Sequence, residues 1–356
     1  INNGNLTIAG QTAPGGGIQI SGQLTGNSLL NIYASNVVVQ YLKLRHGYGS
    51  GTVTQDGDCI GAYGKNIMID HCTVMWTTDE NTSSWAVSAN QINNVTWSWC
   101  LLAEPMLSHP TNLLTGGNTS TIADGMVNLD AHHCLFSNSS HRNPLVMIKS
   151  FRFVNNIVYN WKYRATHMSG GANVDIIGNL YKAGPITPST SNYEICAYPL
   201  SQGEGQAAFG SPSIYAVGNQ GPHVSNPASD NWVMVRETNS ENGSNPTVGP
   251  LSTTYKRTTP MAALPYPIPV TAVGSLAAAI IPTVGASRRL DANGAWVANR
   301  DAVDTRLINE YNAGTGILPA HEDDVGGFPV IASGTAYADT DQDGMADAWE
   351  MAQFGN

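Results

Sequence analysis

The sequence predicts an all-β fold, namely a right-handed, single-stranded parallel β-helix with long loops and a short helical wrap near its C-terminal end. Three observations lead to this prediction. A short alternating motif recurs along the chain, the spacing between its copies is irregular, and charged residues make up only 12% of the 356 residues while 37 residues are glycine. Few charges and many glycines favour stacked strands and turns over charged helices.

The recurring motif begins with a small or polar residue, usually Asn, continues with alternating apolar residues, and usually has Cys or Asn six positions later. Weaker copies start at Asn5 and Ser213, and the clear copies span 36–42, 66–72, 94–100, 128–134, 150–156 and 173–179. Alternation with a period of two over about five residues indicates a half-buried strand. One such strand per coil, with variable connections, is typical of a solenoid and excludes helical repeats.

Equivalent positions of neighbouring coils are expected to stack at about 4.8 Å, the spacing between paired strands. Cys72, Cys100 and Cys134 then form one internal column, which Asn156 and Asn179 continue. A thiol metal site or nucleophile is the alternative interpretation of these cysteines. A free cysteine more often behaves as a small buried apolar residue, and asparagine amides can hydrogen-bond along a ladder.

The remainder of the chain is expected to contain loops and a covering segment. Residues 183–269 are rich in Pro, Ser and Gly, with one further strand at Ile214–Asn219. Helices are predicted at Ser275–Ile280 and at Arg300–Tyr311, the second with Val303, Leu307 and Ile308 on one face. The predicted boundaries are 1–285 for the β-helix, 286–336 for a helical wrap that packs on it, and 337–356 for a calcium-binding loop.

The calcium loop is predicted from the spacing of its acids. Oxygen ligands occupy positions one, three, five, nine and twelve of a twelve-residue segment, and Gly344 stands at position six, where such a loop turns sharply. The ligands are Asp339, Asp341, Asp343, Asp347 and Glu350. An acidic tail with chance spacing is the alternative. The predicted role of the bound calcium is structural.

Charge and hydropathy restrict the partners. The net charge of −10 and the isoelectric point near 5.2 argue against a broad basic surface for nucleic acid or anionic lipid. An apolar run of about 20 residues, which a membrane span requires, is absent from the sequence, and the first residues lack a signal-peptide pattern. We expect a monomer that binds neither nucleic acid nor membrane.

Stacking also brings polar residues of different coils together. Asp79 lies seven positions after Cys72, and Arg142 lies eight positions after Cys134. They are two coils apart, about 10 Å by the strand spacing, which leaves room for a sugar carboxylate and a bridging cation. Asp56 and Asp58 flank a single glycine and can converge on one hard cation, although an ordinary turn with solvated acids is the alternative.

Over residues 1–184, and more weakly at 284–304, the chain resembles the pectate lyases of the first polysaccharide lyase family. The matching motifs are 5–17, 56–58, 69–80, 132–144 and 154–159. The resemblance implies calcium-assisted β-elimination of polygalacturonate that gives 4,5-unsaturated oligogalacturonides. It also implies an acidic plant cell-wall polysaccharide as partner and a secreted, cell-surface or periplasmic location.

The resemblance assigns roles to individual residues. Asp56, Asp58 and Asp79, together with Glu80, would be calcium ligands, and Arg142 would be the base that removes the C5 proton. Arginine is a poor base at neutral pH, so nearby cations must favour its neutral form, and Arg164 is our candidate for that neighbour. The segment Leu101–Pro110 lacks the substrate-binding lysine of the family, and Met147 replaces its second arginine. Lys149 and Arg164 are expected to supply these substrate contacts.

Two other functions stay open at this point. A β-helix polygalacturonase would hydrolyse the same substrate with paired carboxylates, but its expected motifs are absent. A non-catalytic carbohydrate-binding or adhesion protein would use calcium only for structure and would bind sugars through aromatic side chains. Four tryptophans are candidates for such binding, although strand spacing requires that some of them lie in the core, and they are Trp76, Trp85, Trp97 and Trp99.

Overall fold

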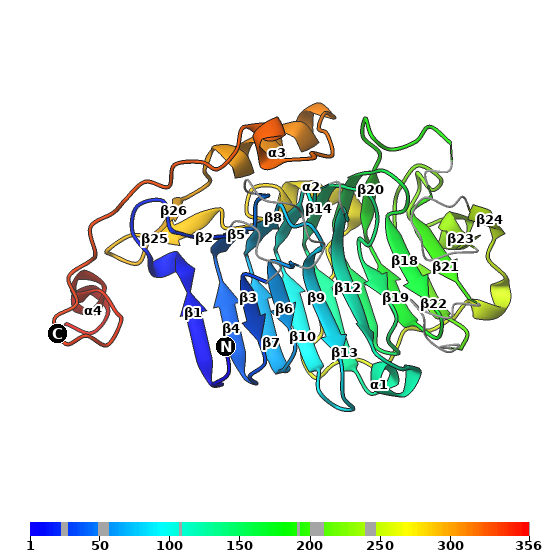
Figure 1. The fold of residues 1–356 in the computed structure, drawn as a ribbon, viewed down its shortest axis with the longest axis horizontal. Coiled ribbons are helices and arrows are strands. Elements are labelled where there is room, and N and C mark those ends of the chain that lie inside the picture. Colours follow the sequence, from blue (N-terminus) through cyan, green and yellow to red (C-terminus); the bar gives the residue numbers. More distant parts are fainter. Residues whose placement is uncertain are drawn as a thin grey trace.

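A computed structural model describes residues 1–22, 28–48, 57–106, 109–190, 193–199, 210–238 and 247–355. Three sheets run side by side along the molecule, and the chain passes through them in turn as it winds (Figure 1). Every strand pairing between neighbouring coils is parallel. The molecule is therefore a parallel β-helix, as the sequence predicts.

Sheet A contains β1 (Leu6–Ala9), β4 (Val37–Gln40), β7 (Lys65–Asp70), β10 (Asn93–Ser98), β13 (Val127–His132), β16 (Phe151–Val154), β19 (Asn173–Ile177) and β22 (Ser213–Val217). Sheet B contains β2 (Ile18–Ser21), β5 (Leu42–Arg45), β8 (Thr73–Met75), β11 (Leu101–Ala103), β14 (Leu135–Ser139), β17 (Ile157–Trp161) and β20 (Leu180–Lys182). Sheet C contains β3 (Leu30–Ile32), β6 (Ile60–Ala62), β9 (Glu80–Ala86), β12 (Thr111–Gly117), β15 (Leu145–Val146), β18 (Thr166–Ser169), β21 (Ile195–Tyr198), β23 (Val235–Thr238) and the antiparallel β24 (Thr247–Pro250).

The remaining elements lie outside the three sheets. They are the hairpin β25 (Arg288–Leu290) and β26 (Trp296–Ala298), the helices α1 (Ser120–Asp124), α2 (Val273–Ile280), α3 (Ala302–Ala313) and α4 (Asp347–Gln353), and the 3₁₀ turns η1 (Gly10–Thr12), η2 (Asn231–Met234), η3 (Thr253–Tyr255) and η4 (Glu322–Val325).

Sheet A is built from the repeated motif, and its register confirms the predicted stacking. Leu6 lies opposite Val37, which confirms the weak copy at Asn5. At the other end of the sheet Asn173 lies opposite Ser213, which confirms the copy there. The Asn at the start of a copy turns the chain into the strand, because its φ is about +55° to +60° at Asn36, Asn66 and Asn94. Asparagine tolerates this left-handed conformation better than most residues.

The predicted internal column is also present. The sulfur of Cys134 accepts a hydrogen bond from the Cys100 N–H at 3.3 Å, and the Cys134 N–H donates to the Asn156 side chain at 2.9 Å. Asn156 and Asn179 continue the column, and the same contacts extend to Asn219 and Asn231. The five cysteines are free and buried, as expected of small core residues.

Replacing Asn179 with Ala is expected to lower the free energy of unfolding by about 3 kcal/mol. The fully buried Asn179 amide accepts from the Asn156 N–H at 2.8 Å and donates to the Phe153 carbonyl at 2.9 Å, so alanine leaves buried backbone groups without partners. Urea unfolding measures the change. The control is Asn94→Gly, where we expect a loss below about 1 kcal/mol, because the Asn94 amide donates to Asn66 and accepts from Asn128 in exposed contacts. Equal losses at the two positions would contradict this interpretation.

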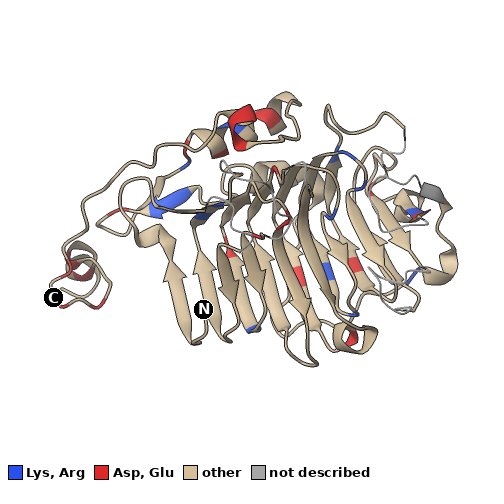
Figure 2. Cartoon of the chain, in the orientation of Figure 1, with Lys and Arg blue, Asp and Glu red and all other residues tan. Residues whose placement is uncertain are grey.

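Two helices cover the outer face of sheet B, and both were predicted from the sequence. Apolar side chains of α2 and α3 pack with those of sheet B in a second core that includes Leu276, Leu307, Leu135 and Ile157. Ion pairs fix α3, because Arg45 binds Asp304 at 2.8 Å and Arg306 binds Glu104 at 2.7 Å. Charged residues are sparse along the sheets and gather on α3 (Figure 2). No helix in the described part of the chain is long and apolar enough to cross a membrane.

The structure differs from the sequence-based description between residues 183 and 269. We expected one further strand there, and the structure adds β21, β23 and β24. These strands belong to sheet C, whereas the motif marks the strands of sheet A, so the repeat does not reveal them. The segment that covers sheet B already includes α2, which lies before residue 286.

Candidate active site

A polar cleft of about 430 Å³ lies on the outer side of sheet C. Its walls come from several successive coils, because Asp58 precedes β6, Glu80 begins β9, Leu114 belongs to β12 and Arg142 precedes β15. Asp79 also lines the cleft. Four of the residues singled out by the sequence analysis thus meet in one place.

A buried amide ladder holds the coils in register beneath the cleft. Asn81 follows Glu80 in the chain and donates to the Asn112 side chain at 2.6 Å. Asn112 donates in turn to Asn143, which follows Arg142, at 2.7 Å. The residues that precede the first and the last asparagine of this ladder, Glu80 and Arg142, are thereby brought together although they lie two coils apart. The φ of Arg142 is +58°, a left-handed conformation that the surrounding hydrogen bonds must maintain.

Asp58, Glu80 and Arg142 form a buried charged group. The Asp58 carboxylate accepts hydrogen bonds from the Glu80 N–H at 3.2 Å and from the Ser83 hydroxyl. Arg142 donates to the Glu80 carboxylate. Burial, together with the neighbouring Glu80 carboxylate, raises the pKa of Asp58 well above its ordinary value. Burial also raises the pKa of Glu80 to about 7, although the charge of Arg142 opposes this shift.

These pKa shifts predict how the metal-free protein responds to pH. The folded pKa of Glu80 lies above its unfolded value of about 4.5, so its contribution to stability is greatest below about pH 4.5 and is lost as the pH rises towards about 7. As the pH rises over this range, the free energy of unfolding of the wild type should therefore fall by roughly 2–3 kcal/mol relative to that of Glu80→Gln. Urea unfolding in EDTA at about pH 5 and about pH 7 measures it. A difference that is constant or moves in favour of the wild type with pH would contradict the prediction.

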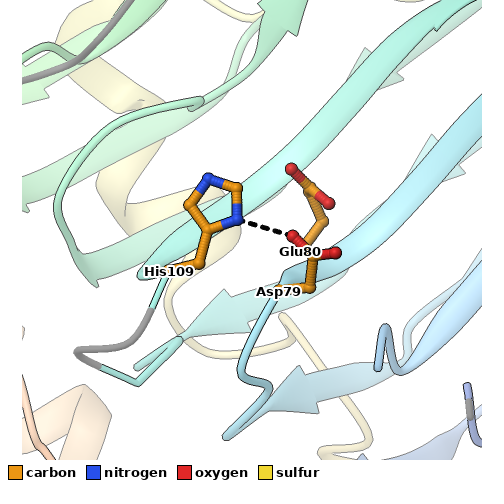
Figure 3. A group of neighbouring side chains, drawn as sticks. All are labelled: Asp79, Glu80 and His109. Carbon is orange, nitrogen blue, oxygen red and sulfur yellow. Dashed lines mark hydrogen bonds and ion pairs between the residues drawn. The ribbon is translucent and has the colours of Figure 1, made fainter. Parts of the chain in front are cut away.

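His109 extends the charged group beside Asp79 (Figure 3). The His109 ring nitrogen Nδ1 lies 2.6 Å from the Asp79 carboxylate, and both side chains are about one quarter to one third exposed. Burial alone would raise the pKa of Asp79, but the hydrogen bond from His109 lowers it below its ordinary value. Ligand atoms of Asp79, Glu80 and His109 all lie within 4.8 Å of one another. His109 was not predicted as a site residue, although it is a basic residue within the segment Leu101–Pro110.

The donor set fits a divalent cation. Three carboxylates, from Asp58, Asp79 and Glu80, line one cleft. The charge of Glu80 raises the pKa of Asp58, and the charge of Asp79 raises the pKa of both Asp58 and Glu80. A cation between such groups would relieve this repulsion. Carboxylate oxygens are ligands that calcium prefers. Asp56, the fourth acid predicted for this group, lies outside the described residues.

The structure does not bring Arg164 or Lys149 into the cleft. Arg164 is only 1% exposed, and burial lowers its pKa. Burial lowers the pKa of His141, and the charges of Arg142 and Arg164 lower it further, so both guanidinium groups act on the same imidazole. Arg164 is thus a cation close to His141, the residue that precedes Arg142. The Lys149 side chain is 51% exposed and pairs with Asp124 of α1.

The C-terminal acids form a second candidate cation site. Carboxylate oxygens of Asp339, Asp341 and Asp343 lie within 4.8 Å of one another, and one buried oxygen of Asp339 lacks a hydrogen-bond partner. Gly344 has a φ of +92° and donates its N–H to Asp339 at 3.0 Å, which agrees with the sharp turn expected at that position. Asp347 begins α4 and accepts two hydrogen bonds from Thr340.

Comparisons with known proteins find similar sequences and a similar fold. No protein-family model matches the chain. The chain is 30% identical over 360 residues to the protein named probable pectate lyase C of Aspergillus flavus, covering 98% of this chain and 72% of that relative, and 29% identical, with the same coverage, to the protein of that name in Aspergillus oryzae. A solved pectate lyase structure, described for its substrate specificity and anti β-elimination mechanism, matches 79% of this chain and 67% of its own, with a TM-score of 0.50 and 15% identity.

Proposed function

The chain belongs to the pectate lyase family and is a polysaccharide lyase that acts on pectate, and from this premise we propose how its cleft performs the reaction. The proposal is calcium-assisted β-elimination of polygalacturonate, with Arg142 as the base and 4,5-unsaturated oligogalacturonides as products. The observation that carries it is the meeting of Asp58, Asp79 and Glu80 with Arg142 in one polar cleft.

The reaction begins at the C5 proton of a galacturonosyl residue. Arg142 removes this proton, the C4–O4 bond breaks, a double bond forms between C4 and C5, and the electron pair leaves on the glycosidic oxygen, which takes up a proton. Arg142 can act as the base only in its neutral form, which is scarce because the pKa of arginine exceeds about 12. The positive charge of Arg164 disfavours a second positive charge nearby, so it favours the neutral form of Arg142.

The substrate carboxylate must be neutralised, because removing the C5 proton adds negative charge next to it. Asp58, Asp79 and Glu80 are proposed to hold the calcium ion, with Asp56 as a further ligand. The ion would act as a Lewis acid that stabilises the charge developing on the uronate. The residues themselves orient the substrate by fixing where its carboxylate lies relative to Arg142.

Incubation with polygalacturonate at alkaline pH, with and without EDTA, tests the proposed function. We expect a rise in ultraviolet absorbance from the unsaturated uronide, and its loss in EDTA. A polygalacturonase would instead release reducing ends without this absorbance. A carbohydrate-binding protein would give neither signal, and either of these results would contradict the proposed reaction.

The C-terminal loop is proposed to bind a second calcium ion with a structural role, through Asp339, Asp341, Asp343, Asp347 and Glu350. Asp343→Asn is expected to reduce the calcium stoichiometry in isothermal titration calorimetry from two ions to one, because it removes a ligand of the three-acid cluster. The variant should keep the wild-type kcat at saturating calcium, since the loop lies apart from the cleft residues. A variant that still binds two ions would contradict the loop assignment.

We further propose that the protein works outside the cell as a monomer on the acidic polysaccharide of plant cell walls. A polymeric substrate of this kind requires an exported enzyme. The calcium loop supports this location, because loops of this type in extracellular modules bind calcium at about 10⁻⁴–10⁻³ M.

A further inference from the structure

The structure separates the four candidate tryptophans by their surroundings. Trp76 and Trp97 are fully buried. Trp99 lies between two other rings, with its centroid 5.7 Å from that of His71 and 4.6 Å from that of His133. Trp85 is half-buried and lines the polar cleft together with Glu80 and Arg142. Trp85 is therefore the one of the four whose ring is placed to meet a substrate.

The Trp85 ring is held in place by the neighbouring coil. Trp85 lies in β9 opposite Gly116 of β12. A Cβ atom on Gly116 would stand 2.6 Å from Cζ3 of the Trp85 ring, so the ring lies directly against the backbone at a position that only glycine allows. The indole N–H donates to the Asn118 side chain at 2.6 Å. The ring thus lies against Gly116, and its N–H is fixed by the hydrogen bond to Asn118.

The position of the ring fits the spacing of a polymer. The Ser83 hydroxyl donates to the Asp58 carboxylate. Ser83 lies two residues before Trp85 on the same side of β9, which corresponds to roughly 7 Å along the strand. This separation is suited to a ring that contacts a sugar residue next to the one at the charged group. A pyranose presents apolar C–H groups on its faces, and an indole offers a large apolar surface to such groups.

We propose that Trp85 forms a sugar-binding subsite that stacks on the C–H face of a galacturonosyl ring adjacent to the residue that is cleaved. This proposal deepens the proposed function and depends on it for the identity of the polymer. The contact is made to the face of the sugar ring and not to its carboxylate. The subsite therefore accepts a galacturonosyl residue whether its carboxyl group is free or methyl-esterified, and it binds without calcium.

Binding measured in EDTA tests the subsite independently of catalysis. We expect trigalacturonate and its methyl ester each to change the intrinsic tryptophan fluorescence of the wild type, and we expect this change to disappear in Trp85→Phe. The control is Trp296→Phe, because Trp296 is 49% exposed on β26, outside the cleft. A fluorescence change that is the same in Trp85→Phe as in the wild type would overturn the proposal. Binding of trigalacturonate but not of its methyl ester would overturn the claim about esterification.

Steady-state kinetics provide the second measurement. Trp85→Ala and Gly116→Ala, which retains the indole but displaces it, should each raise KM for polygalacturonate by about tenfold and leave kcat within about twofold. Gly274→Ala in α2 is the matched control, because a Cβ there meets nothing within 4 Å. A fall in kcat at unchanged KM would show that the ring positions the charged group instead, and would overturn the subsite. A wild type without lyase activity would contradict the proposed function, while the fluorescence result would still decide whether the ring binds sugar.

Discussion

Arg142→Gln is expected to lower kcat on polygalacturonate by about 1,000-fold, within the range that a general base contributes. The substitution removes the guanidinium from the cleft and keeps a side chain of similar length at a position with a φ of +58°. Glutamine has no basic nitrogen, so the C5 proton lacks an acceptor. The ultraviolet assay at saturating substrate and calcium measures the loss, and circular dichroism checks that the β-helix is intact.

A second variant at Arg142 tests the geometry of its guanidinium, and a variant at another arginine is the control. Arg142→Lys keeps the positive charge but not the planar fork that reaches Glu80, and we expect a large loss of kcat here too. Arg289→Gln on β25, where the side chain bonds to the Tyr337 hydroxyl at 2.7 Å, removes an arginine that does not line the cleft and should leave kcat unchanged. An Arg142→Gln variant with kcat within tenfold of the wild type would exclude Arg142 as the base.

Asp58→Asn is expected to have opposite effects on activity and on the stability of the metal-free protein. Activity should fall by about 100-fold or more, because the cleft loses a carboxylate that holds the proposed cation. The free energy of unfolding in EDTA should rise near neutral pH, because burial and the nearby charge of Glu80 raise the pKa of Asp58, and asparagine removes this buried carboxylate. The asparagine can still accept the hydrogen bond from the Glu80 N–H.

Chelation provides the matched comparison for Asp58→Asn. EDTA should reduce the activity of the wild type to that of the variant, and should reduce the variant little further. Asp343→Asn in the C-terminal loop is the control, since it removes a carboxylate of similar type from the other candidate cation site. If Asp58→Asn lost stability in EDTA, or kept full calcium-dependent activity, the electrostatic description of the cleft would be wrong.

The fold was predictable because the residues that set it recur at fixed positions. The Asn that begins a coil has to adopt a positive φ, and the residue six positions later has to fit a buried column, so both leave a visible pattern in the sequence. The same pattern placed Asp79 and Arg142 on one side of the β-helix, two coils apart. The strands β21, β23 and β24 escaped because they belong to sheet C, whereas this pattern marks the strands of sheet A.

The side-chain directions within the site were less predictable. Arg142 and Arg164 each lie eight positions after a residue of the internal column, yet only Arg142 lines the cleft. Arg142 has a left-handed backbone and Arg164 does not, so the same count along the coil leads to different side-chain directions. His109 lies in a connection between β11 and β12 without any period, and only the folded chain shows that it contacts Asp79.

The position of the bound cation tests the central claim most directly. Crystals of Arg142→Gln, soaked with calcium and trigalacturonate, should show an anomalous peak about 2.3–2.6 Å from carboxylate oxygens of Asp58, Asp79 or Glu80, with a uronate carboxylate on the same ion. A peak found only in the loop 339–350, or a sugar bound away from the cleft on sheet C, would contradict the account.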